Sequence, residues 1–144
     1  MDPKQRDEYY DALLRSTVFK QVVATSFTGT TFATLWAPAT GKKFKLKGVS
    51  LQLGISTTLA GSPSDLVALF DNANNNSTAV TACPLVNLSL AGTNAAGTSF
   101  GTIQFFLREG YTSAAINNTL RIGSYGTIGA GVIRVVGVVF GDEV

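Results

Sequence analysis

From residue 18 onward, the sequence is a series of short runs rich in β-branched and aromatic residues. Segments rich in Gly, Asn, Ser and Pro separate these runs. No helical pattern of useful length follows residue 20, which argues against a fold that alternates helices with strands. About seven to nine short strands between regular turn signals are typical of a β-sandwich. We therefore predict an all-β fold, an antiparallel β-sandwich or jelly roll, for a body of residues 21–144.

The hydrophobic alternation places the individual strands. Near Gly48 the apolar side switches, which predicts a β-bulge that returns the apolar residues to one face. The run 132–140 is apolar on both sides and predicts a central strand covered on both faces. Residues 57–64 and 91–98 are predicted loops, and residues 108–110 a hairpin turn. The predicted strands are 18–25, 31–36, 44–55, 66–70, 80–90, 103–107, 119–123 and 132–140.

The first 20 residues differ in composition from the rest. They hold eight of the chain's twenty charged side chains, whereas residues 21–141 hold ten. Asp2, Pro3 and Gln5 form a helix-start signature, and the pattern predicts a helix to about residue 17. This helix either packs on its own domain or reaches a neighbouring subunit. The change in composition favours an inter-subunit arm of residues 1–20, whose predicted contact residues are Tyr9, Tyr10, Leu13, Leu14 and Val18.

A cluster of lysines at residues 42–47 is the strongest charge feature of the body. Lys43, Lys45 and Lys47 share one face of an extended strand. Lysines on an edge strand block unwanted pairing, and this is one interpretation. The other is a surface for an anionic partner such as an acidic patch on a protein. Nucleic acid is not the expected partner, because the run has a single aromatic residue and the net charge is only +2. The candidate partner face is Lys42, Lys43, Lys45 and Lys47.

Residue chemistry excludes most catalytic sites. The chain has no His and one Cys, so no Ser-His-Asp or Cys-His site and no intrachain disulfide can form. Cys83 lies in an apolar stretch and is predicted to be a buried thiol. The few carboxylates of the body are not spaced as a glycosidase pair, and a calcium site at residues 71–76 would have one carboxylate. We expect no enzyme activity, no cofactor and no metal.

The sequence shows neither the pattern of a secretory signal nor that of a membrane-spanning segment. The N-terminal residues are charged where a secretory signal would be apolar, and no apolar window is long enough to cross a membrane. We therefore expect a protein made in the cytoplasm of its host cell, without a signal peptide and with no membrane partner.

Residues 35–49, Leu-Trp-Ala-Pro-Ala-Thr-Gly-Lys-Lys-Phe-Lys-Leu-Lys-Gly-Val, resemble a hairpin of small β-sandwich structural proteins of tailed phages. The whole layout, a charged helical arm before a Thr- and Gly-rich body, is similar to capsid decoration (cementing) proteins of thermophilic long-tailed phages. The resemblance implies a non-enzymatic homotrimer on the outer capsid surface. Its arms would contact neighbouring subunits, and its body would bind coat protein and stabilise the shell.

A second hypothesis keeps the fold and changes the partner. A carbohydrate-binding or receptor-binding β-sandwich module of a phage tail or fibre would need an exposed aromatic side chain on which a sugar could stack. Trp36 and Tyr125 are the candidates for that role.

Overall fold

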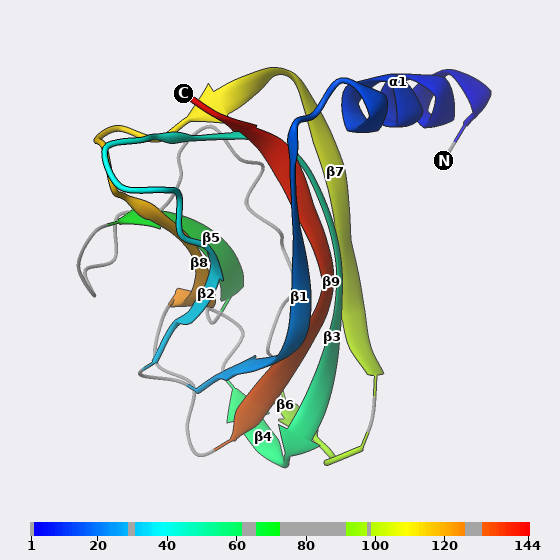
Figure 1. Ribbon diagram of the computed structural model, residues 1–144. Coiled ribbons are helices and arrows are strands. Elements are labelled where there is room, and N and C mark those ends of the chain that lie inside the picture. The colour runs from blue at the N-terminus through cyan, green and yellow to red at the C-terminus, as the bar shows by residue number, and fades with distance from the viewer. Residues whose placement is uncertain (1, 29–30, 62–65, 73–91, 98, 126–130) are drawn as a thin grey trace.

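The structure is a computed structural model that describes residues 2–28, 31–61, 66–72, 92–97, 99–125 and 131–144. Within these ranges the chain forms one helix and nine strands (Figure 1). In chain order they are α1 (Pro3–Leu14), β1 (Val18–Phe27), β2 (Ala33–Trp36), β3 (Phe44–Thr57), β4 (Leu59–Gly61), β5 (Leu66–Asn72), β6 (Gly92–Asn94), β7 (Ser99–Thr112), β8 (Thr119–Tyr125) and β9 (Val132–Glu143). The predicted strand at 80–90 and Cys83 lie outside the described residues.

Two antiparallel sheets pack face to face and confirm the predicted β-sandwich. The large sheet has the strand order β1-β9-β3-β7, and the small sheet has the order β2-β8-β5. Figure 1 shows the two sheets as opposite walls, with α1 outside the large sheet at the end where β7 begins to curve over the top. A separate ladder joins β4 to β6 at the far end.

The pairing of strands is nested along the chain. β1 pairs with β9, β2 with β8, β3 with β7 and β4 with β6, all antiparallel. Apart from β5, the described strands thus form a double ribbon, whose successive pairs lie in the large sheet, the small sheet, the large sheet and the separate end ladder. Further pairing of β3 with β9 joins two of these pairs into the large sheet, and pairing of β5 with β8 completes the small sheet. This nested connectivity is that of a jelly roll.

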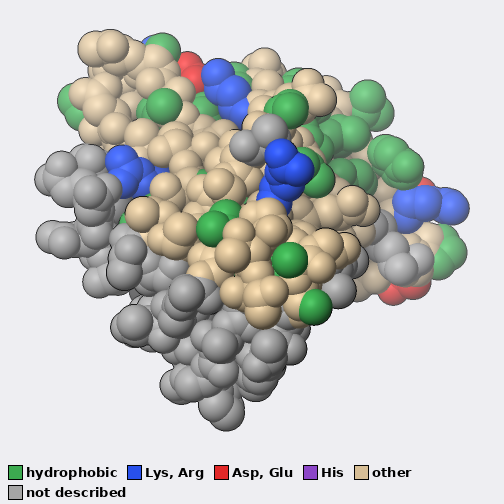
Figure 2. All heavy atoms as spheres, turned by 90° about the horizontal axis from the view of Figure 1, so that it is seen from below, with side chains coloured by type: hydrophobic (Ala, Val, Ile, Leu, Met, Phe, Trp, Pro, Cys, Tyr) green, Lys and Arg blue, Asp and Glu red, His purple; other side chains and the backbone are tan. Residues whose placement is uncertain are grey.

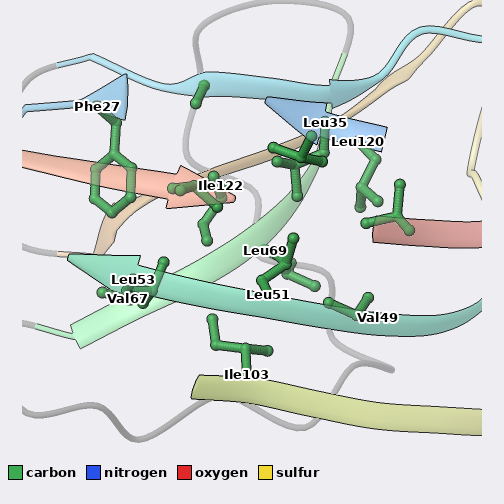
Figure 3. Packing of buried hydrophobic residues seen from close by; sticks show 14 of the residues in the cluster. Phe27, Leu35, Val49, Leu51, Leu53, Val67, Leu69, Ile103, Leu120 and Ile122 are labelled. Carbon is green, nitrogen blue, oxygen red and sulfur yellow. The ribbon is translucent and has the colours of Figure 1, made fainter. Parts of the chain in front are cut away.

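The core fills the space between the two sheets (Figure 3). Alternate residues of each strand point inward, as the period of two requires, and the side chains from the two sheets interdigitate. Figure 3 shows Leu51 of β3 opposite Leu69 of β5, with Ile103 of β7 below them. The largest fully buried side chains are Trp36, Phe27, Phe44, Phe70, Phe140, Leu46, Leu51, Leu53, Ile103 and Leu120.

The predicted bulge at Gly48 is confirmed. The register of β3 shifts between Leu46 and Gly48 against both of its neighbours, β7 and β9. Leu46 and Val49 are therefore both buried, although they are an odd number of residues apart. The bulge keeps Lys45 and Lys47 away from the core while the apolar residues on either side of it enter the core.

Three predictions about the strands are wrong. The predicted loops at 57–64 and 91–98 contain the short strands β4 and β6. These segments have no strong β propensity, but they pair with each other across the end of the sandwich. The predicted hairpin turn at 108–110 lies inside β7, where Gly110 has a φ of +73° and the pairing with β3 shifts register between Phe106 and Tyr111. β9 is central in its sheet, but its outer face is partly open, since Val136 is 39% exposed.

Candidate functional site

The helix begins as the sequence predicts. The Asp2 carboxylate accepts a hydrogen bond from the backbone N–H of Gln5 at 2.8 Å, and the Gln5 side chain accepts one from the N–H of Asp2 at 3.2 Å. The helix ends at Leu14, before the predicted residue 17. Val18, the last predicted contact residue of the arm, is the first residue of β1 and is not part of the helix. Residues 18–20 of the predicted arm pair with β9 as part of the sheet.

Helix α1 rests on its own body mainly through Tyr9. The Tyr9 ring meets the Phe140 ring edge to face, with centroids 5.6 Å apart. Two open grooves of about 430 and 460 Å³ remain between the helix and the large sheet. The first is lined by Glu8, Asp11, Arg15, Lys47, Phe106, Arg108 and Glu109, and the second by Gln5, Tyr9, Gln104, Phe105 and Phe106. The helix is therefore loosely packed on β7.

Tyr10, Leu13 and Leu14 form an apolar stripe on α1, and two of these three side chains point away from this contact. Tyr10 is 51% exposed and Leu14 is 83% exposed, whereas Leu13 is half-buried. Phe19 of β1 is also 51% exposed and stacks on Phe140 with centroids 6.2 Å apart. A band of aromatic rings therefore runs from Tyr10 through Tyr9 and Phe140 to Phe19. Exposed apolar surface of this kind is typical of interaction sites.

The junction between α1 and β1 is fixed by Asp142 of β9. One carboxylate oxygen of Asp142 accepts hydrogen bonds from the N–H and hydroxyl of Thr17 at 3.0 and 2.9 Å. The other oxygen lies 2.6 Å from the Lys47 ammonium, which also donates to the carbonyl of Arg15 at 3.5 Å. Burial alone would raise the pKa of Asp142, but the hydrogen bonds from Lys47 and Thr17 outweigh it and hold the pKa below the ordinary 3.8.

The four lysines of the candidate partner face have different environments. The edge-strand interpretation is wrong, because β3 lies between β9 and β7. Lys47 is paired with Asp142, and the ammonium of Lys43 donates to the carbonyl of Ala114 at 3.2 Å. Lys45 is half-buried, whereas Lys42 is exposed. The structure therefore keeps Lys42 as the most accessible member of the predicted surface.

Beyond the helix and the lysine segment, the outward-pointing side chains of the large sheet form an almost uncharged surface, which we call the outer face. It consists of Gln21, Val23, Ser50, Gln52, Thr102, Gln104, Arg134, Val136 and Val138. Arg134 is the one charged side chain in this set. Figure 2, which views a different side of the molecule from below, shows few and separate basic groups on the part of that side that the structure describes. Such a surface gives little electrostatic protection against association.

The aromatic residue proposed for sugar stacking is not accessible. Trp36 is only 1% exposed, and its indole N–H donates to the Glu143 carboxylate at 3.1 Å. Its ring lies 5.8 Å from the ring of Phe44 inside the core. Trp36 therefore cannot be the exposed aromatic residue that the carbohydrate-binding hypothesis needs. The side chain of Tyr125 lies outside what the structure describes.

Asp71, at the start of the segment 71–76 for which no calcium site is expected, belongs to a buried hydrogen-bond network. It is buried and accepts three hydrogen bonds, from the Tyr111 hydroxyl at 2.7 Å, the N–H of Ala114 at 2.7 Å and the Asn118 amide at 2.8 Å. Residues 73–76 of that segment lie outside the described ranges. The sequence carried no signal for this network, because its members come from β5, β7 and the segment before β8.

The described part of the chain contains no group of three acidic or cysteine side chains close enough to hold a metal ion. Among the same residues, no helix is long and apolar enough to cross a membrane. Comparisons with models of known families, with curated proteins and with solved structures gave no match to this chain. The arguments for function below therefore come from the residues and the geometry.

Proposed function

We propose that this protein is a non-enzymatic structural protein of a virus particle, a trimeric capsid decoration protein that binds coat protein and stabilises the shell. The observation that carries the proposal is the apolar stripe of α1. Tyr10 and Leu14 point away from the body on which the helix rests. A helix that packs only on its own domain would bury this stripe, since burial of a large apolar side chain stabilises by about 1.5–3 kcal/mol.

The body supports the same proposal. A β-sandwich with an almost uncharged outer face is suited to association with other protein surfaces. The chain has no His, and its most buried described carboxylate, Asp71, is held by three structural hydrogen bonds. The jelly roll is also a common fold of viral capsid proteins, which is an analogy at the level of fold.

The proposed coat-protein contact is the lysine segment. Lys42 is exposed, and Lys43 and Lys45 lie beside it at the start of β3, at the same end of the sandwich as the root of the helix. An acidic patch on the coat protein would complement these charges. Because such contacts are solvent-exposed, we expect their contribution to fall as salt is added.

The test compares the solution mass of two proteins by light scattering after gel filtration. One is the full chain, and the other lacks residues 1–15, which removes α1 and leaves β1 complete. The proposal expects a trimer for the full chain and a smaller species for the truncated one. A full chain that is monomeric at micromolar concentration would contradict the proposed trimer.

The virion location needs its own test. Antibodies against the protein should label the outer surface of virus particles produced from the genome that encodes it. Particles that lack the protein altogether would contradict this part of the proposal. The alternative of a glycan-binding tail or fibre module loses its candidate Trp36, because that side chain is buried in the core.

A further inference from the structure

The outward side of α1 carries more than apolar residues. Asp7, Tyr10 and Leu14 follow each other at intervals of three and four residues, so they lie on one face of the helix. Asp7 is exposed, with its nearest cation, Arg6, at a long 3.7 Å. This side of the helix, which we call the outward face of α1, is an acidic group followed by two large apolar groups.

The outer face of the large sheet offers the complementary pattern along β9. Arg134, Val136 and Val138 are alternate residues and point to the same side. Arg134 is exposed, and no ion pair of Arg134 is found among the described residues. Beside it is a shallow hollow of about 180 Å³, lined by Gln52, Leu53, Gly54, Arg134 and Val136. A basic group followed by two apolar groups therefore faces solvent.

The spacings of the two patterns agree. On the helix, Tyr10 lies about 4.5 Å and Leu14 about 10.5 Å beyond Asp7 along the axis. On the strand, Val136 lies about 6.6 Å and Val138 about 13 Å beyond Arg134. The differences are within the reach of side chains. A helix laid along β9 could pair Asp7 with Arg134 and place Tyr10 and Leu14 over the two valines.

The same molecule cannot make this contact in the arrangement observed. The N–H of Thr17 donates to the carbonyl of Gly141 and to Asp142, which fixes the root of the helix at one end of β9. Tyr9 turns the opposite side of the helix onto Phe140. Arg134 is six residues from Phe140, about 20 Å along the strand. The outward face of α1 is therefore available to another molecule only.

We infer that the outward face of α1 docks on the outer face of the large sheet in a second copy of this chain, with Asp7 against Arg134 and Leu14 in the apolar part of that surface. The second copy is favoured over another partner because one chain carries both halves of the contact, matched in charge, polarity and spacing. The inference rests on the self-association proposed above and specifies which two surfaces of the chain would form the contact. Such a contact is head-to-tail, and it closes into a ring when the rotation between copies permits.

The first experiment uses engineered disulfides between separate chains. In a Cys83→Ser background, protein with Leu14→Cys is mixed with protein carrying Val138→Cys under mild oxidation. The matched control partner carries Ile116→Cys, which replaces an apolar residue that is more than half exposed and lies outside the proposed contact, in the segment between β7 and β8. We expect a mixed Leu14–Val138 disulfide to dominate. Equal yield with the Ile116→Cys partner, or a dominant Leu14–Leu14 product, would overturn the docking.

The second experiment exchanges the charges. Arg134→Glu and Asp7→Arg should each weaken self-association by about tenfold or more, and the double variant should recover most of it. Lys42→Glu is the matched control, since it makes the same charge change outside the proposed contact. An oligomer of unchanged affinity in Arg134→Glu overturns the docking and leaves the proposed trimer standing. A wild-type protein that is monomeric at micromolar concentration overturns both.

Discussion

The ring of Phe140 lies directly over Gly48 of the neighbouring strand. A Cβ atom at position 48 would lie 2.6 Å from two of the ring carbons, so only glycine leaves room for this ring. The same ring also contacts the rings of Tyr9 and Phe19, and Phe140 is fully buried although it points out of the sandwich. Gly48 thus has two roles. It lies at the bulge in β3, and it leaves space for the ring of Phe140, which α1 contacts through Tyr9.

Gly48→Ala should therefore loosen the helix as well as the sheet. We expect the free energy of unfolding to fall by about 1–3 kcal/mol, because the added methyl group forces the buried Phe140 ring to move. Urea denaturation measures the loss. Ser50→Ala, a small change on the same side of β3, is the control and should cost far less. A stability of Gly48→Ala equal to that of the wild type would contradict the packing described for Phe140.

Asp142→Asn should destabilise the junction of helix and sheet. The carboxylate accepts charge-assisted hydrogen bonds from Lys47 and Thr17, and we expect a loss of about 1–3 kcal/mol at neutral pH. Asp11→Asn, which removes an exposed pair with Arg15, is the control and should cost about 0.5 kcal/mol or less. Equal losses in the two variants would show that the Asp142 contacts are no stronger than an exposed pair.

The pH dependence of the same residue follows from its lowered pKa. A carboxyl group whose pKa is lower in the folded state than in the unfolded state contributes stability above the ordinary value of 3.8. That contribution is lost as the pH falls through the folded-state value. The difference in unfolding free energy between wild type and Asp142→Asn should therefore be constant near neutral pH and narrow below about pH 3.8. A difference independent of pH would contradict the assignment.

Asp71→Asn should disturb a buried network. An asparagine amide would bring its own N–H groups toward donors such as the Tyr111 hydroxyl and the N–H of Ala114, and one of these groups would lose its acceptor. We expect a loss of about 1–3 kcal/mol in thermal or urea denaturation. Tyr111→Phe removes a single hydrogen bond of the network and should cost about 1 kcal/mol. The prediction fails when Asp71→Asn is the milder of the two.

Trp36→Ala should lower the stability of the fold by about 3–5 kcal/mol, since it opens a cavity in the core. Trp36→Phe keeps most of the volume and loses only the hydrogen bond to Glu143, so its loss should be near 1 kcal/mol. Thermal unfolding separates the two variants. Nearly equal melting temperatures for wild type and Trp36→Ala would contradict the burial of Trp36 and would support the sugar-stacking hypothesis again.

The sequence by itself determined the local features. The capping box of Asp2 and Gln5 depends on residues three apart, and the bulge at Gly48 follows from a change of side in one strand. The alternation of apolar residues also established the sandwich, because a period of two with turn signals leaves few other folds. These features depend on neighbours in the chain, and so their signals are readable without a structure.

The tertiary structure alone decided which surfaces are open. Trp36 is buried in the core, where its indole N–H donates to Glu143, a residue distant in sequence. The lysines of β3 lie in a central strand because β9 pairs beside it. Asp142 fixes the root of the helix across the sheet, and Tyr9 on Phe140 turns Tyr10 and Leu14 outward. All these contacts join residues far apart in the chain. Local periodicity carries no information about such pairs, since they form only when the double ribbon rolls up.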